Sequence, residues 1–269
     1  MELTTFRGKL RAILYPICFA TIGMLVAFAL KKIDPAMSKS IRSLIAFAVT
    51  SGSVLLLFPS VFGLPFGKVS IRDWLYRLGF GSPVPLGRFV LLGVLCAACT
   101  LGGMLVGTLL TGEYAFSADT ITLGQALFTL TPGIWEEILF RGVLVLVLHH
   151  LTGSLKKAFW LQIAIFAAIH VKGLDPLSFI DAFSVGVITL AFTYCAWKTM
   201  SLIPGIIFHY LHDTFLFAVQ LPEGVYTGVR DNALFYAGLW LSVGLCLWLV
   251  KLASEKHGCV AEQRLYPAS

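Results

Sequence analysis

A long apolar segment that contains three charged side chains constrains this chain more than any other feature. It runs from about Leu123 to Leu148 and is long enough to cross the hydrocarbon core of a bilayer. Glu136, Glu137 and Arg141 lie near its centre. Each charge at the centre of a membrane helix costs about 2.5–3.5 kcal/mol on insertion scales. One explanation is an ion pair that only holds helices together. Two further polar clusters in later apolar segments argue instead for a functional site.

The composition is that of a membrane protein. Of the 269 residues, 58% are hydrophobic and only 13% are charged, and the mean hydropathy is +0.86. Soluble domains carry about 25% charged residues. We therefore expect an all-α, polytopic transmembrane helical bundle that forms a single integral membrane domain over residues 1–269.

The apolar segments predict about eight membrane spans. The fifth is short and could be re-entrant, which leaves the count open by one. Between the second and third spans, apolar residues recur at roughly helical spacing over residues 68–78 and predict an amphipathic helix at the membrane interface. The predicted spans cover residues 12–30, 43–62, 89–110, 123–149, 157–171, 177–197, 202–221 and 232–252.

The net charge of +6 does not indicate nucleic-acid binding, because the Lys and Arg residues lie mainly between the apolar segments. The termini and the loops on their side of the bilayer hold about 13 Lys and Arg residues and the opposite loops about 6, which favours cytoplasmic termini. The four positive residues between Lys31 and Arg42 run against this pattern. Cys96 and Cys99 form a CxxC within an apolar run and are expected to be packing residues.

The first polar cluster combines two adjacent glutamates with an arginine. Glu137 and Arg141 are four residues apart, so their side chains lie on one helix face and can pair. Glu136 lies about 100° around the helix from Glu137, and pairing of Glu137 leaves it facing another partner. Such a carboxylate suits a proton-accepting and proton-donating role. Pro132 removes one backbone hydrogen bond and predicts a bend just before the glutamates.

Two further clusters lie in the fifth and seventh segments. Phe166 and His170 share a helix face, so the aromatic ring lies one turn below the imidazole. His209 and Asp213 are also four residues apart, so the carboxylate could fix the orientation and tautomer of the imidazole. Pro204 predicts a bent or opened start to the seventh span. Taken alone, each cluster could serve packing.

Together, the three clusters predict one polar cavity, because ionisable residues in membrane spans usually face a bundle interior or a water-filled space. Acid, base and donor groups without a nucleophilic Ser or Cys beside them fit water activation better than covalent catalysis. The residues expected to contribute are Glu136, Glu137, Arg141, His170, His209 and Asp213.

The order of these motifs resembles a known family. Glu-Glu-x-x-x-Arg at 136–141, Phe-x-x-x-His at 166–170 and His-x-x-x-Asp at 209–213 are similar to the motifs of the CPBP family, also called Abi. That family comprises the CAAX-processing endopeptidases of eukaryotes and many prokaryotic relatives. The resemblance covers about residues 120–221, and the spans within residues 12–110 are not diagnostic.

The resemblance implies an intramembrane glutamic protease. Glu136 would be the catalytic glutamate that activates water, and His170 its partner in polarising that water. His209 and Asp213 match the pair assigned to stabilising the oxyanion of the tetrahedral intermediate. The residues expected to support and orient the site are Glu137, Arg141 and Phe166.

One position departs from the family pattern. Asn is common where this chain has Asp213, and an ionised carboxylate cannot donate a hydrogen bond to an oxyanion. Either Asp213 is protonated, or it orients His209, which then donates alone. We favour the second interpretation.

The sequence therefore predicts an intramembrane endopeptidase that hydrolyses a peptide bond in a membrane-associated protein or peptide, without a cofactor. Two alternatives stay open. A metal-dependent membrane protease could use Glu136, His170, His209 and Asp213 as ligands, although no His-Glu-x-x-His occurs. A non-proteolytic membrane immunity or peptide-binding protein could use the same cluster without cutting.

We expect the partners to be the lipid bilayer and a membrane-associated protein or peptide substrate, with no nucleic acid. The short loops suggest a multi-pass protein of a prokaryotic cytoplasmic membrane. The substrate is left open between prenylated C-terminal tails, leader peptides and C-terminal sorting segments.

Overall fold

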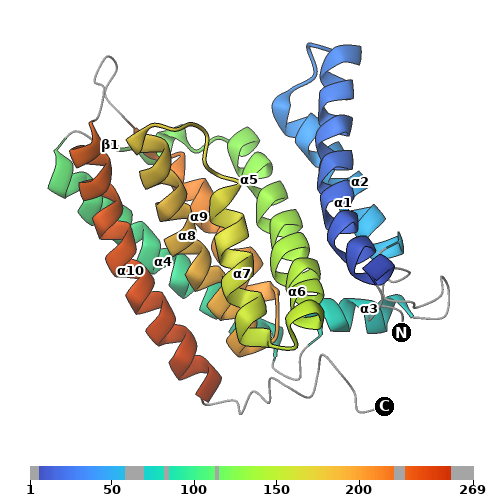
Figure 1. Cartoon of the computed structure of the whole chain (residues 1–269). Helices are drawn as coiled ribbons and strands as arrows, with labels where there is room; N and C mark the ends of the chain where they lie inside the picture. The colour runs from blue at the N-terminus through green and yellow to red at the C-terminus, as the bar shows by residue number, and fades with distance from the viewer. Residues whose placement is uncertain (1–5, 58–69, 82–84, 113–114, 221–227, 256–269) are drawn as a thin grey trace.

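The computed structural model describes residues 6–57, 70–81, 85–112, 115–220 and 228–255. These residues form a helical bundle with one pair of two-residue strands (Figure 1). The α-helices are α1 (Phe6–Ile33), α2 (Lys39–Leu57), α3 (Ile71–Leu75), α4 (Leu86–Thr111), α5 (Leu123–Glu136), α6 (Val145–Thr152), α7 (Leu155–Ala168), α8 (Pro176–Thr199), α9 (Ile203–Leu216) and α10 (Val229–Glu255). The shorter elements are π-helices at Tyr76–Phe80 and Glu137–Leu144, a 3-10 helix at Ala118–Thr120, and strands β1 (Ala115–Phe116) and β2 (Val219–Gln220). The all-α class predicted from the sequence is confirmed.

Three of the described helices are long and apolar enough to cross a membrane. They are α4, α8 and α10, with hydropathy values of 2.4, 1.7 and 2.0. Helices α7 and α9 have 14 residues each, or about 21 Å of helix, which is shorter than the roughly 30 Å hydrocarbon core. Helix α5 also has 14 residues, but it continues through the π-helix at Glu137–Leu144 into α6. The count of about eight spans therefore stays a prediction.

The surface of the bundle is also apolar. Large hydrophobic side chains are exposed on the outer helices, among them Met24 at 66%, Leu109 at 83% and Leu241 at 76%. Soluble monomers rarely expose contiguous apolar surfaces of this kind. Together with the three apolar helices, this exposure supports a membrane protein.

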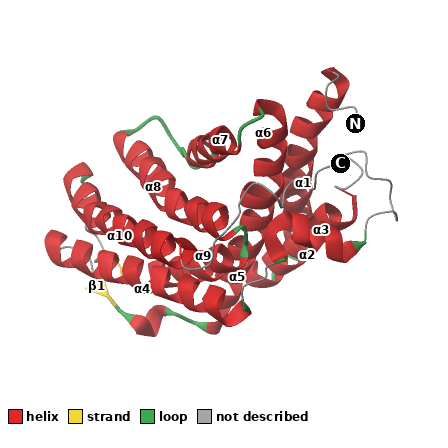
Figure 2. Ribbon diagram, turned by 90° about the horizontal axis from the view of Figure 1, so that it is seen from below, coloured by secondary structure: helices red, strands yellow, loops and turns green. Residues whose placement is uncertain are grey.

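Helix α9 is central because it packs against α4, α5 and α8. In Figure 1 the α1–α2 hairpin lies on one side of the bundle, beside α5 and α6, while α4 and α10 lie on the other. Figure 2 shows the same bundle from below, with α9 between α5 and α8. Residues from α5, α7, α8 and α9 can therefore meet in the interior.

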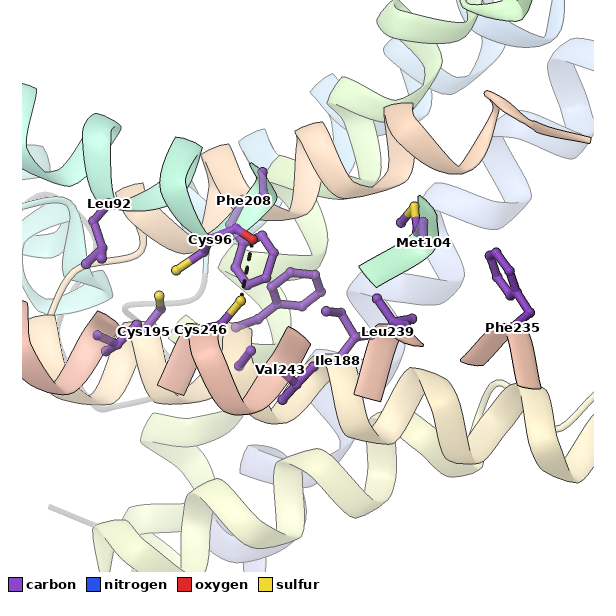
Figure 3. Packing of buried hydrophobic residues seen from close by; sticks show 14 residues of the cluster. Leu92, Cys96, Met104, Ile188, Cys195, Phe208, Phe235, Leu239, Val243 and Cys246 are labelled. Atoms are coloured by element: carbon purple, nitrogen blue, oxygen red, sulfur yellow. Dashed lines mark hydrogen bonds between the residues drawn. The ribbon is translucent and has the colours of Figure 1, made fainter. Parts of the chain in front are cut away.

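One hydrophobic core joins α4, α8, α9 and α10 (Figure 3). Cys96, Cys195 and Cys246 are buried within it, and the Cys246 thiol donates to the Cys96 backbone carbonyl at 3.4 Å. Cys99 is half-buried and packs against the same cluster. These contacts are those expected of packing residues.

Two expected elements differ from what the structure shows. Helix α9 ends at Leu216, and the seventh predicted span does not continue as helix to 221, because the amides of Phe217 and Ala218 bond in turns to Thr214 and Phe215. Strand β2 then pairs antiparallel with β1.

The amphipathic segment is helical from residue 71, as the short α3 followed by a π-helix, and residues 68–69 lie outside the described part. A helix at the membrane interface was expected here, but part of its apolar face packs into the protein, because Trp74 and Leu78 are buried in the bundle core.

Candidate active site

The two glutamates lie at a junction between two kinds of helix. Helix α5 starts with a capping box in which Thr122 and Gln125 satisfy each other's backbone amides. It runs through Pro132 and gives way to a π-helix at Glu137. Such π segments are frequent at functional sites. The junction sets Glu136 on the wall of a cavity and buries Glu137 completely.

Glu137 and Arg141 form a buried ion pair, as their spacing predicts. Glu137 Oε1 lies 3.1 Å from Arg141 Nη1, and both side chains are fully buried. The guanidinium lies 4.4 Å from the centre of the Phe166 ring and 5.5 Å from that of Phe192. Helix α9 can pass this close because Gly205 has no side chain, and a Cβ there would lie 3.0 Å from Glu137 Oε2.

His209 is held by the same glutamate. Its Nδ1 donates to Glu137 Oε1 at 2.9 Å, and its ring stacks on Phe192 with the centroids 4.6 Å apart and an interplanar angle of 18°. Nε2 then lies 3.8 Å from Glu136 Oε2 and 3.5 Å from Asp213 Oδ2. The shortest contact that orients the imidazole therefore comes from Glu137, whereas the sequence motif suggests Asp213.

His170 lies just beyond the end of α7. Its Nδ1 is 2.7 Å from the backbone carbonyl of Phe166, and a carbonyl can only accept a hydrogen bond, so Nδ1 carries the proton. The Phe166 and His170 rings lie 4.6 Å apart, so the two side chains are adjacent as expected, although His170 follows the helix and does not lie on its face. In a neutral ring, this leaves Nε2 of His170 as an acceptor. The loop that follows ends at Asp175, whose pKa is lowered by hydrogen bonds from Ser178.

A cavity of about 370 Å³ collects most of the predicted site residues. Helices α5, α7, α8 and α9 supply its walls, and its size is within the range of about 300–1,000 Å³ usual for ligand sites. Glu137 and Arg141 lie behind the wall and not on it. The predicted site residues that line the cavity are Glu136, Phe166, His170, His209 and Asp213.

Among the lining residues that were not predicted to belong to the site, Phe192 and His212 lie beside the predicted groups. Phe192 lies within an apolar span, and no sequence signal separates it from a lipid-facing aromatic residue. His212 is 3% exposed and lines the cavity, and its Nδ1 has no hydrogen-bond partner among the described residues. The sequence signal that could have placed His212 in the site is its position next to Asp213, one turn before the end of α9.

Within the described ranges, no group of three or more His, Cys, Asp or Glu side chains is arranged to hold a metal ion. The four groups considered as ligands from the sequence line the cavity without forming such a group.

One family model matches part of the chain. Residues 118–215 match the family described as type II CAAX prenyl endopeptidase Rce1-like. Over this segment the chain is similar to the CAAX proteases. The matched segment includes all of the predicted site residues, from Glu136 to Asp213. Neither the comparison with curated proteins nor that with solved structures gives a match. The CAAX protease family supports a peptide-bond hydrolase of the intramembrane type.

Proposed function

We propose that this protein is a CAAX-type protease that hydrolyses a peptide bond in a membrane-associated protein or peptide, with Glu136 as the group that activates water. The observation that carries the proposal is the shared cavity: a carboxylate from α5, an imidazole that follows α7, and an imidazole and carboxylate from α9 line one space of about 370 Å³. These are the groups that water activation requires.

The contacts of the two adjacent glutamates support different roles. Glu137 Oε1 is within reach of both Arg141 and His209. Arg141 therefore balances the negative charge of this carboxylate, which serves to position the His209 imidazole. Glu136 keeps 16% of its side chain exposed, and its nearest ionic contact is the 3.8 Å distance to His209 Nε2. Because 3.8 Å is beyond hydrogen-bond range, the Glu136 carboxylate is available to accept a proton from water.

In the proposed reaction a water molecule lies between Glu136 and His170. One water hydrogen is donated to the Glu136 carboxylate and the other to His170 Nε2, the acceptor left when Nδ1 donates to the Phe166 carbonyl. Glu136 takes the proton as the water oxygen attacks the scissile carbonyl carbon. It then returns this proton to the leaving amine, so that the carboxylate is regenerated.

The oxyanion of the tetrahedral intermediate is assigned to His209. In its imidazolium form the ring donates from Nδ1 to Glu137 and from Nε2 into the cavity. Asp213, 3.5 Å from Nε2, faces the same nitrogen and holds it near the cavity wall before substrate arrives. We therefore retain the interpretation that His209 is the donor to the oxyanion, and we add Glu137 as the residue that positions it.

The walls around these groups favour an apolar substrate segment. Apart from Thr129 and His212, the remaining lining is aromatic and aliphatic, and the outer surface of the bundle exposes large apolar side chains. The proposed substrate is therefore a peptide held at the bilayer of a prokaryotic cytoplasmic membrane, with or without a prenyl group. The apolar lining residues are Phe128, Val185, Ile188, Leu216 and Phe217.

The test is proteolysis of a peptide library by the purified protein in liposomes, with products identified by mass spectrometry. The library holds matched prenylated and unprenylated CAAX peptides together with leader-like and sorting-segment peptides. Glu136→Gln is compared with wild type and with Glu255→Gln, which removes a 58% exposed carboxylate at the end of α10. We expect cleavage by wild type and Glu255→Gln only, unchanged by a chelator.

Other outcomes would redirect the assignment. Cleavage that a chelator abolishes and zinc restores would favour a metal-dependent protease. Peptide binding that Glu136→Gln retains, without cleavage by any form of the protein, would favour an immunity or peptide-binding role. Cleavage that persists in Glu136→Gln would refute Glu136 as the water-activating group.

A further inference from the structure

A second cavity lies on the side of α5 away from the candidate active site. It has a volume of about 240 Å³ and lies between α1, α2 and α5, where the α1–α2 hairpin meets the bundle (Figure 1). Most of its wall is apolar or aromatic, and two cationic side chains lie at one end. We call it the hairpin groove. Its lining consists of Gly23, Met24, Ala27, Lys39, Arg42, Ser43, Ala46, Phe47, Thr50, Phe128 and Trp135.

The part of the chain that the structure describes offers the two cations of the groove no acidic partner. Lys39 Nζ lies 4.3 Å from the centre of the Phe128 ring, and Arg42 donates one N–H to the Met37 carbonyl. Among the described residues no carboxylate lies within 4.0 Å of either side chain. The remaining N–H groups are therefore available to an anion, and a guanidinium beside an ammonium suits a phosphate group.

The groove is already formed in the protein alone. The Ser40 hydroxyl donates to the Gly124 carbonyl at 2.9 Å, and the Ser43 and Thr131 hydroxyls lie 2.9 Å apart, so the first turns of α2 are fixed against α5. At the other end α1 and α2 touch. A Cβ on Gly23 would lie only 2.2 Å from Thr50 Oγ1.

The groove therefore has a cationic mouth and a closed apolar end. From Lys39 to Thr50 it extends along 12 residues of α2, about 16 Å of helix. This polarity matches a molecule with an anionic head and a hydrocarbon tail. The outer faces of α1 and α2 expose Leu25, Phe28 and Ile45, which is the surface expected of helices that contact lipid.

We propose that the hairpin groove binds one anionic phospholipid, with its phosphate at Lys39 and Arg42 and an acyl chain along Ala46, Phe47 and Trp135. The site also gives a role to Lys39 and Arg42, which lie on the side of the membrane where the distribution of loop charges predicts few positive residues. The proposal does not depend on the proposed proteolysis. Phe128 lines both the groove and the active-site cavity, so a substrate tail is the competing occupant that the test must distinguish.

The test uses Trp135 as a reporter. The full chain is reconstituted in phosphatidylcholine vesicles that contain a small fraction of one brominated lipid. This lipid is either brominated phosphatidylglycerol or brominated phosphatidylcholine, at the same mole fraction. Brominated acyl chains quench tryptophan fluorescence on contact. Wild type is expected to be quenched more by the brominated anionic lipid. This excess should disappear in Lys39→Gln/Arg42→Gln and in Trp135→Phe. It should persist in Lys156→Gln/Lys157→Gln, a matched loss of two exposed charges at the start of α7.

Equal quenching of the wild type by the two brominated lipids overturns the proposal, whatever the variants do. So does an excess that survives in Lys39→Gln/Arg42→Gln. If the excess is absent and this variant instead raises KM only for peptides with a free C-terminal carboxylate, and not for their amides, the groove is a substrate site and the lipid assignment is wrong.

Discussion

The buried Glu137–Arg141 pair makes a quantitative prediction about stability. Both side chains are fully buried and their charged atoms lie 3.1 Å apart. Removing one partner of such a pair leaves an uncompensated buried charge, which costs about 3–5 kcal/mol. We therefore expect Arg141→Met, and separately Glu137→Gln, to lower the free energy of unfolding by about 3–5 kcal/mol.

The double variant Glu137→Gln/Arg141→Met should be more stable than either single variant. It buries neither charge, and the Gln oxygen can still accept the hydrogen bond that His209 Nδ1 donates to Glu137 at 2.9 Å. The assay is reversible unfolding in mixed detergent micelles, followed by near-UV circular dichroism, for wild type, both single variants and the double variant. Additive losses in the double variant, or a loss below about 1 kcal/mol for Arg141→Met, would refute the reasoning because a buried pair is strongly coupled.

Three further substitutions test the packing around the site. Gly205→Ala would place a Cβ 3.0 Å from Glu137 Oε2. We expect this overpacking to lower the free energy of unfolding by about 1–3 kcal/mol in the same assay, and unchanged stability would contradict this expectation. Phe192→Leu removes the ring that stacks on His209, which loses about 0.5–1.5 kcal/mol of ring interaction. This substitution should lower kcat more than it changes KM, and an unchanged kcat would count against the stacking role. His212→Phe removes a buried nitrogen that has no hydrogen-bond partner among the described residues, a group that costs about 1–3 kcal/mol. Stability should therefore not fall, and a clear loss of stability would contradict this reasoning.

The sequence predicts much of the site because its motifs are local. A spacing of four residues brings Glu137 beside Arg141 and Phe166 beside His170, and the structure has both contacts. Helix boundaries are also close to those expected: α8 covers Pro176–Thr199 where residues 177–197 are predicted.

The contacts that the sequence does not predict join different helices. The 2.9 Å bond between Glu137 and His209 depends on how α5 and α9 pack, and Gly205 permits it by leaving space for the carboxylate. Helical periodicity within one segment carries no information about that packing. The same applies to Phe192 and to the hairpin groove. The pairing of β1 with β2 depends on backbone hydrogen bonds between distant segments, for which two-residue strands leave no pattern.

The role of Glu136 in activating water is tested by the turnover of a cleaved peptide by Glu136→Gln, alongside wild type and Glu255→Gln in the same liposomes. We expect kcat to fall by about 10²–10⁴-fold in Glu136→Gln, the usual contribution of a positioned base. The dissociation constant for the peptide and the turnover of Glu255→Gln should stay near the wild-type values. A Glu136→Gln protein that still turns over at the wild-type rate would show that another group activates the water.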